Sequence, residues 1–473
     1  MERHDFQPRT IGSLLPNMCW LFGILTVFVA LISPFTGSRN LLSLVYWMEI
    51  SKDLFSIFGS FAPLHAMVMC MMGVAVLQRS GVFPAFSRFI LSAAPRYLLF
   101  AAMALLAIIS NIISDAAVII MPTIFAAAFR RMGYHPWGGI VLGFAASDAL
   151  FTIQPFVAVA DTVLAAITGA ALPPGETAVS VHPLMNWYFN ITATPFLILV
   201  SVLVTKHRII PSLGSFDPVP EEARKVSEGE KKGLLRLAAF SSLFVLALFL
   251  LSPLLSATGG FLHGAGLYFL FCILAGLLFG KTAGTIRSLK EIPALFSEGV
   301  QGTTSFIVTA LPAALFIRFF KDSGIGETLF SLILKSAGAA SGGIPGAGIL
   351  FFILLVLGMN FFITSASMKW MMLAPLALPV FSGYGLSPAA ILLAFRIGSC
   401  ATNIISPFEY YLPVILALME ANRRENDPPV GPRALFRLTM PYAAAYAGTL
   451  LFLFFFWFFM ELSPGPGTSF MIR

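Results

Sequence analysis

The sequence predicts an all-α polytopic membrane protein with about nine transmembrane helices, two re-entrant hairpins and two broken helices arranged as an inverted repeat. Composition is the first reason, because 58% of the 473 residues are hydrophobic, only 11% are charged, and the mean hydropathy is +0.88. Many apolar runs reach the roughly 20 residues that cross a bilayer. Polar interruptions recur inside two of those runs. A soluble globular domain and a disordered chain are thereby excluded, and residues 1–473 are expected to form one integral membrane unit.

Seven uninterrupted crossings and one interfacial helix are expected along the chain. The interfacial helix covers 41–58, where apolar residues alternate with polar ones at helical spacing. The expected crossings are 17–35, 60–79, 187–205, 236–257, 264–281, 303–320 and 438–461. Broken helices at 137–170 and 389–420 bring the total to nine.

Two further apolar segments, 97–129 and 346–382, carry polar residues in their middle. Each is either two full crossings or a re-entrant hairpin with a polar tip. Either choice leaves the later loops on the same side, so charge placement does not decide between them. The polar tips and the repeat favour hairpins, because irregular backbone at membrane depth is tolerated only where protein buries it or it lines a cavity.

The distribution of Lys and Arg predicts the orientation. Residues 206–235 contain six basic residues, whereas 171–186 contains none, so 206–235 is expected to be a cytoplasmic loop. Counting crossings back from there places the N-terminus on the cytoplasmic side of the membrane. The charge of +7 lies mostly in such loops and signals orientation rather than nucleic-acid binding.

An internal repeat relates 97–170 to 346–420, the two expected halves of a transport core. Adding 252 to the numbering aligns the broken helices, and a one-residue slip places Asn111, Ser114 and Pro122 on Thr364, Ser367 and Pro375. Repeat-related broken helices are where secondary transporters bind substrate and coupling ion. The residues in register are Gly133 with Gly385, Pro136 with Pro388, Ser147 with Ser399, Pro155 with Pro407 and Phe156 with Phe408.

Ionisable residues at membrane depth are candidates for function because burying them costs about 2.5–3.5 kcal/mol on insertion scales. The alternative for each is a structural ion pair or a cap on a half-helix. Asp161 can exchange a proton when buried, and Lys369, Arg396 and the half-helix N-termini favour a carboxylate ligand. The set comprises Asp115, Asp148, Asp161, Lys369, Arg396 and Glu409.

Neutral polar side chains near the breaks suit a hard cation such as Na⁺, which binds several oxygen atoms. The candidate ion ligands are Asn360, Thr364, Ser399, Thr402 and Asn403, and the neutral polar candidates for substrate contact are Asn111, Ser114, Ser365 and Ser367. Trp370 is either a stacking platform for an aromatic substrate or an interfacial anchor. The four Cys residues have no metal-ligand spacing. Na⁺ or H⁺ as coupling ion is the only non-protein component expected besides a small-molecule substrate and the bilayer.

Several blocks resemble the p-aminobenzoyl-glutamate transporter (AbgT) family over nearly the whole chain. They are Phe61–Leu64, Gln78–Gly81, Ser110–Ala117, Asn186–Phe189, Ser365–Trp370 with Leu373–Pro375, and Thr402–Pro407. The resemblance implies a homodimer of the bacterial inner membrane, in which a core of hairpins and broken helices moves as an elevator against a scaffold. It also implies ion-coupled transport of p-aminobenzoyl-glutamate or related folate catabolites, with sulfonamide efflux in some members. The site residues it implies are Asp161, Asn360, Trp370, Pro388, Arg396 and Pro407.

One departure from the family pattern concerns charge. The pattern Arg-Ile-Gly-Asp-Ser reads Arg396-Ile-Gly-Ser-Cys400 here, so Ser399 replaces a carboxylate. Asp148 and Glu409 stand where the family pattern has uncharged residues, and one of them is the candidate to restore the charge.

Alternatives to a transporter are a passive channel and a membrane-embedded, lipid-modifying enzyme. An enzyme is disfavoured because His65 is the only histidine clearly within a span and no ligand-spaced cluster appears.

Overall fold

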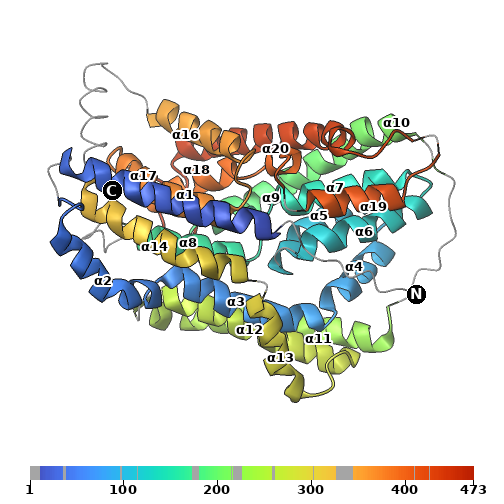
Figure 1. The fold of residues 1–473 in the computed structure, drawn as a ribbon. Coiled ribbons are helices and arrows are strands. Elements are labelled where there is room, and N and C mark those ends of the chain that lie inside the picture. Colours follow the sequence, from blue (N-terminus) through green and yellow to red (C-terminus); the bar gives the residue numbers. More distant parts are fainter. Residues whose placement is uncertain are drawn as a thin grey trace.

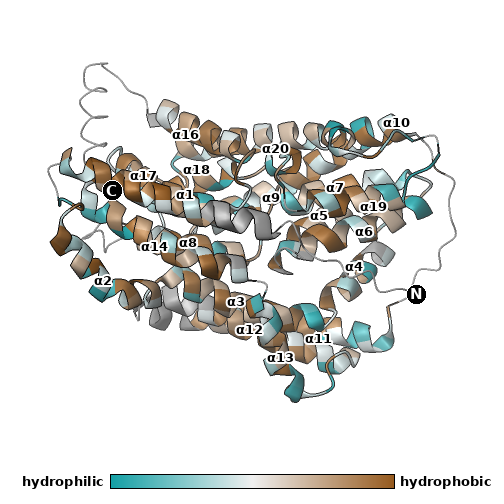
Figure 2. Ribbon diagram, in the orientation of Figure 1, coloured by the Kyte–Doolittle hydropathy of each residue, from teal (hydrophilic) through white to brown (hydrophobic). Residues whose placement is uncertain are grey.

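The computed structural model describes residues 11–35, 39–95, 98–113, 116–172, 181–214, 216, 226–257, 261–301, 303–325, 345–409, 411–425 and 427–472. These residues form a bundle of helices (Figure 1), and the only β-type pairing among them is an isolated bridge between Leu386 and Met471. Hydrophobic residues cover most of the helix lengths, while hydrophilic residues gather around α10, Ile210–Leu213 (Figure 2). The prediction of an all-α membrane protein is confirmed.

One group of helices, here called the scaffold layer, packs around α3. Helix α3 lies against α12 and α13, and α1 lies against α14. Close packing depends on glycine: a Cβ on Gly299 of α13 would lie 2.5 Å from the Met71 carbonyl oxygen of α3. The layer contains α1 (Ile11–Ile32), α2 (Leu44–Gly59), α3 (Ala62–Arg79), α4 (Val82–Ala93), α11 (Glu228–Ala257), α12 (Phe261–Ala283), α13 (Ile292–Gln301) and α14 (Thr304–Ser323).

The remaining helices, here called the core layer, form two interlocked half-bundles. In one, the hairpin α5–α6 and α7 pack with α19; in the other, the hairpin α16–α17 and α18 pack with α8. Each broken helix therefore contributes one segment to each half-bundle (Figure 1). The members are α5 (Leu99–Ser110), α6 (Ala116–Arg131), α7 (Pro136–Asp148), α8 (Val159–Ala171), α16 (Pro345–Met359), α17 (Ala366–Ser382), α18 (Pro388–Gly398) and α19 (Leu412–Ala421), with α9 (Trp187–Val204) and α20 (Pro432–Met460) packed against them.

Helix lengths support the hairpin interpretation. Helix α5 has 12 residues and α16 has 15, which at 1.5 Å per residue gives about 18 and 22 Å, short of the roughly 30 Å hydrocarbon thickness. Every residue of α7 and of α18 is buried, so the broken helices are enclosed by protein rather than lipid. Polar, unwound backbone is tolerated at membrane depth for that reason.

Local geometry reproduces the repeat. Gly133 and Gly385 both have positive φ, +76° and +83°, which glycine adopts without steric cost. Two positions later, His135 and Ser387 each cap the following helix through a side-chain acceptor, with Pro at the first helical position. The one-residue slip predicted for the hairpins is wrong for Asn111. Asn111 directly follows α5, the first helix of its hairpin, and the residue that directly follows α16 is Asn360 rather than Thr364. The polar tips of the two hairpins differ in length, and this difference shifts the alignment of one hairpin on the other.

Two predicted boundaries differ from the structure. The segment predicted as loop 206–235 is partly helical: a π-helical turn (Thr205–Ile209) and α10 continue α9, and α11 begins at Glu228. A reciprocal cap starts α11, because Ser227 and Glu230 each bond the other's backbone N–H. The predicted crossing 303–320 falls on α14, and the preceding helical segment Leu289–Gln301 meets it at 52°. Five described segments are individually long and apolar enough to cross a membrane.

Candidate functional site

The two broken helices meet at their breaks. The chain is unwound between α7 and α8 and again between α18 and α19, apart from a short 3₁₀ turn at Asn403–Ile405. The Ala401 N–H donates to the Ala149 carbonyl at 3.2 Å, and Asn403 Nδ2 donates to the Asp148 carbonyl at 2.9 Å. Ala401 has φ +70°, a conformation that costs a non-glycine residue about 1–2 kcal/mol. The repeat-related breaks thus bond directly to each other and hold local strain.

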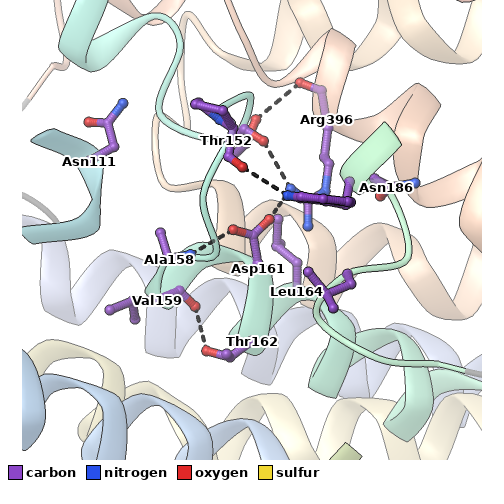
Figure 3. A network of polar contacts seen from close by, with 12 residues as sticks. Asn111, Thr152, Ala158, Val159, Asp161, Thr162, Leu164, Asn186 and Arg396 are labelled. Atoms are coloured by element: carbon purple, nitrogen blue, oxygen red, sulfur yellow. Dashed lines mark hydrogen bonds and ion pairs between the residues drawn. The ribbon is translucent and has the colours of Figure 1, made fainter. Parts of the chain in front are cut away.

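An ion pair joins the second broken helix to the first (Figure 3). Arg396, in the last turn of α18, directs Nη1 to the Thr152 carbonyl at 2.9 Å and to Asp161 Oδ1 at 2.5 Å. Asp161 lies in the first turn of α8, where its other oxygen accepts from the Ala158 N–H at 2.8 Å. A carboxylate is favoured at that helix N-terminus. Both side chains are almost completely buried.

Many buried polar atoms around this ion pair have no hydrogen-bond partner among the described residues. Buried polar groups in proteins normally have a hydrogen-bond partner, so such atoms are candidates to bind an ion, a water molecule or a ligand. Arg396 leaves Nε and Nη2 free, so one edge of its guanidinium is available. The other such atoms are both amide atoms of Gln154, Lys369 Nζ, Ser399 Oγ, and the Oδ1 atoms of Asn111, Asn360 and Asn403.

Lys369 brings a second cation to the centre. It lies on α17, is fully buried, and its ammonium makes no hydrogen bond within the described chain. The carboxylates of Asp148 and Glu409 are near enough to interact with it electrostatically. These carboxylates come from the two different breaks and are also buried. The ionisable residues predicted at repeat-related positions are therefore brought together by the fold, except Asp115, which with Ser114 lies outside the described residues.

Trp370 is completely buried. Its Nε1 donates to Thr168 Oγ1 at 2.9 Å, and its ring lies 4.6 Å from that of Phe395, centroid to centroid. A buried ring does not anchor the protein at a membrane interface, so that alternative is excluded. The tryptophan instead connects hairpin α16–α17 with α8 and α18.

The hairpin asparagines brace the breaks. Asn360 Nδ2 contacts the carbonyls of Gly398 and Cys400 and the hydroxyl of Thr402, at 2.9–3.3 Å. Asn111 Nδ2 contacts the Leu150 carbonyl more weakly, at 3.5 Å. Each hairpin tip therefore satisfies backbone exposed by the unwinding of its own broken helix, and each asparagine keeps one free oxygen.

The other predicted residues lie farther out. Thr364, Ser365 and Ser367 are half-buried at the start of α17, where Ser365 caps the helix. Pro388 begins α18, eight residues from Arg396 and so about 12 Å along the helix axis. Pro407 is exposed and lies within the second break, after the 3₁₀ turn at Asn403–Ile405.

Three polar residues of the centre were not among the predicted site residues: Thr152, Gln154 and Thr168. Thr152 contacts Arg396 through its carbonyl and Cys400 through its hydroxyl, and Gln154 approaches Asp161. Thr152 and Gln154 lie in the first break, so the break itself was the available signal. Thr168 looks like an ordinary helix residue in the sequence, and only its contact with Trp370 marks it.

Comparison with known proteins agrees with this architecture. The p-aminobenzoyl-glutamate transport protein of Escherichia coli (strain K12) is 28% identical over 493 residues, covering 97% of this chain and 95% of that protein. The fold is that of the Alcanivorax borkumensis YdaH transporter, with a TM-score of 0.83 and 23% identity over 95% of this chain and 100% of that one.

The fold is also that of Neisseria gonorrhoeae MtrF, with a TM-score of 0.82 and 24% identity over 95% of this chain and 97% of that one. MtrF represents a class of antimetabolite efflux pumps. The sequence profile of the AbgT putative transporter family matches residues 35–472. A match over nearly the whole sequence, on a fold that carries the paired hairpins and broken helices, establishes that this chain belongs to the AbgT putative transporter family.

Proposed function

We propose that this member of the AbgT family is an ion-coupled secondary transporter of small aromatic carboxylates, such as p-aminobenzoyl-glutamate, in the bacterial inner membrane. The observation that carries the proposal is the unsatisfied guanidinium edge of Arg396, buried between the two breaks. The name of the E. coli relative supports the substrate class, and the MtrF likeness supports extending the tests to antimetabolite efflux, including sulfonamides.

Recognition of a carboxylate follows from the geometry of arginine. A guanidinium offers five N–H donors in a planar fork and binds carboxylates through two parallel hydrogen bonds. In this chain Nη1 is held by Asp161 and Thr152, while Nε and Nη2 have no partner among the described residues. The free edge is the one that forms a bidentate pair. Asp161 thus fixes the orientation of Arg396 and leaves it able to bind substrate.

Coupling to a cation follows from the charge of the centre. Among the described residues, the carboxylates of Asp148, Asp161 and Glu409 outnumber the cations Lys369 and Arg396 by one. An anionic substrate adds further negative charge in a poorly solvated space, which is unfavourable without a compensating cation. A proton on a carboxylate, or Na⁺ bound to the free oxygens of Asn360, Ser399 and Asn403, supplies this compensating positive charge.

Movement of the core layer against the scaffold layer gives access to the centre. Arg396, Lys369 and Trp370 are each 0% exposed, so substrate reaches them only after a rearrangement. The layers contact each other mainly through α8 against α3 and α17 against α14. The polar contacts between the layers include Cys70 Sγ with Thr162 Oγ1 at 3.3 Å and Tyr268 OH with the Ile112 carbonyl at 2.9 Å. Among the described residues few side-chain hydrogen bonds therefore join the two layers, which suits a core that slides past the scaffold.

A homodimer with a cytoplasmic N-terminus completes the proposal. The basic residues that follow α9 and α19 favour that orientation. On the scaffold layer, α1, α2 and α14 line an apolar groove of about 490 Å³ that includes Trp20 and Trp47, a surface suited to a second copy. The mass of the detergent-solubilised protein, measured by light scattering, tests the dimer separately from transport.

Reconstitution into liposomes tests the transport activity. Labelled p-aminobenzoyl-glutamate is expected to accumulate against its gradient when a Na⁺ or pH gradient is imposed, and an ionophore should collapse that accumulation. Arg396→Met should abolish it, whereas Arg287→Met, which removes an exposed arginine, should not. Flux that only follows the substrate gradient would identify a passive channel instead. Failure of every aromatic carboxylate to bind or move would refute the substrate class.

A further inference from the structure

An open groove of about 1230 Å³ lies between α9 and α20, away from the Arg396 centre. Arg433, Arg437 and Ala444 follow one another at helical spacing along α20, and Val204 and Arg208 face them from the end of α9 and its π-helical turn. The rest of the lining is apolar: Phe436, Met440, Pro441 and Ala445. The groove therefore combines three cations at one end of the helices with an apolar floor.

The three guanidinium groups are exposed and form no ion pair with any described residue. Other arginines in this part of the molecule are engaged: Arg424, for example, bonds Asp427 and the Leu213 carbonyl. Like charges placed together without a counter-ion repel one another. An anionic ligand with more than one negative charge relieves that repulsion.

The groove is built on a rigid base. Thr205 and Tyr442 bond through their hydroxyl groups at 2.6 Å, and Ser201 and Tyr446 do so at 2.7 Å. All four side chains are buried, so these bonds fix α9 against α20 beneath the arginines. A surface held in this way presents its charges in a constant arrangement, which lowers the entropic cost of binding a ligand.

The neighbouring surface of α9 is apolar. Phe196, Leu199 and Leu203 are 44–54% exposed and recur at helical spacing, leading away from Arg208 along the helix. On the other side of the groove Met440 is 51% exposed. Exposed apolar residues on a membrane helix face acyl chains, so a molecule bound to the arginines by its headgroup would have hydrocarbon contacts within reach.

We propose that this groove binds an anionic phospholipid, with the phosphates held by Arg208, Arg433 and Arg437 and the acyl chains against α9 and α20. Basic pockets between transmembrane helices on the cytoplasmic side recognise such headgroups. Three arginines favour a headgroup with two phosphates, as in cardiolipin, over one with a single phosphate. Because the site is remote from Arg396, the lipid is bound whether or not p-aminobenzoyl-glutamate is the substrate.

Native mass spectrometry of the full-length protein, delipidated and titrated with defined lipids, tests the proposal. The expected order of affinity is cardiolipin, then phosphatidylglycerol, then phosphatidylcholine. The triple variant Arg208→Gln, Arg433→Gln, Arg437→Gln should bind cardiolipin about 100-fold more weakly, since each arginine near an anionic lipid contributes about fivefold. The triple Arg→Lys variant should retain most of the binding, because headgroup attraction depends mainly on charge.

A matched control removes three exposed lysines elsewhere: Lys232→Gln, Lys281→Gln, Lys290→Gln. It should change cardiolipin affinity by less than about twofold. A second measurement keeps every arginine: Phe436→Trp fluorescence should be quenched by cardiolipin brominated on its acyl chains more than by brominated phosphatidylcholine. Millimolar inorganic phosphate should leave the bound lipid largely in place.

Equal retention of cardiolipin by the Arg→Gln and control variants would overturn the proposal, as would equal quenching by the two brominated lipids. Complete displacement by inorganic phosphate would assign the arginines to a soluble anion. A change of oligomeric mass in the Arg→Gln variant without a change in lipid affinity would assign the groove to a second copy of the chain.

Discussion

Arg396 and Asp161 lie 235 positions apart in the sequence, yet Nη1 of the first is 2.5 Å from Oδ1 of the second. One belongs to the second broken helix and the other to the first, so this ion pair directly connects the two halves of the repeat. It is buried, and a buried pair offsets its desolvation cost only with good geometry and further hydrogen bonds. The Thr152 carbonyl and the Ala158 N–H provide those bonds.

Removing one partner of this pair should destabilise the protein. Asp161→Leu or Arg396→Met alone leaves an uncompensated buried charge, which costs about 3–5 kcal/mol. The double variant leaves no uncompensated charge from this pair, and it should therefore recover most of the thermal stability measured in detergent. Carboxylate binding should stay absent in it. A double variant that binds substrate normally would exclude Arg396 as the ligand.

The carboxylates near Lys369 should determine ion dependence. If Asp148 or Glu409 replaces the carboxylate absent at position 399, Asp148→Asn or Glu409→Gln should abolish the Na⁺ or proton dependence of uptake. Ser399→Asp in the affected variant should restore it. Glu420→Gln, on an exposed residue of α19, is the control. Unchanged sodium and pH profiles in both single variants would rule the idea out.

Cross-linking the two layers should stop transport. Cys70 of α3 and Thr162 of α8 approach to 3.3 Å between side-chain ends, so Thr162→Cys places a second thiol beside a native one. An oxidant should join them if the backbone positions allow disulfide geometry. The elevator proposal then predicts loss of uptake on oxidation and recovery with dithiothreitol. Full uptake by the cross-linked protein would show that the layers need not move.

Packing of α6 on α7 depends on glycine. A Cβ on Gly139 would lie 2.2 Å from the Phe125 carbonyl oxygen, a backbone atom that cannot rotate away. Gly139→Ala should therefore destabilise the protein by about 1–3 kcal/mol, the usual cost of overpacking. Gly448→Ala on α20 meets nothing within 4 Å and should be neutral or slightly stabilising. Equal melting temperatures for the two variants would contradict the close approach.

His135, in the turn before α7, should make stability depend on pH. Burial lowers the pKa of its imidazole, although Asp427 at 2.8 Å opposes the shift. The unfolded chain therefore takes up a proton more readily, and stability falls as the pH drops through about 6.5. His135→Asn keeps a capping acceptor but does not titrate. Its melting temperature should fall less between pH 7 and 5.5; an identical slope would assign the dependence to other groups.

Residue patterns along the chain were enough to predict the helical membrane fold, the broken helices and their repeat. Hydrophobic runs and basic loops are local or periodic signals, and Gly133 and Gly385 mark the same left-handed turn in both halves. The sequence also singled out Arg396, Asp161 and Lys369, because an ionisable residue in an apolar run is conspicuous. Those predictions needed no knowledge of contacts.

The packing of the folded chain sets which of these residues meet. It paired Arg396 with Asp161, placed Lys369 near Asp148 and Glu409, and added Thr152 and Gln154 to the centre. It also left Pro388 about two helical turns away from Arg396. Partnership across more than 200 residues depends on how the half-bundles interlock and on how long each hairpin tip is. No local pattern carries that information, since the free energy of a buried charge depends on neighbours that the fold alone brings to it.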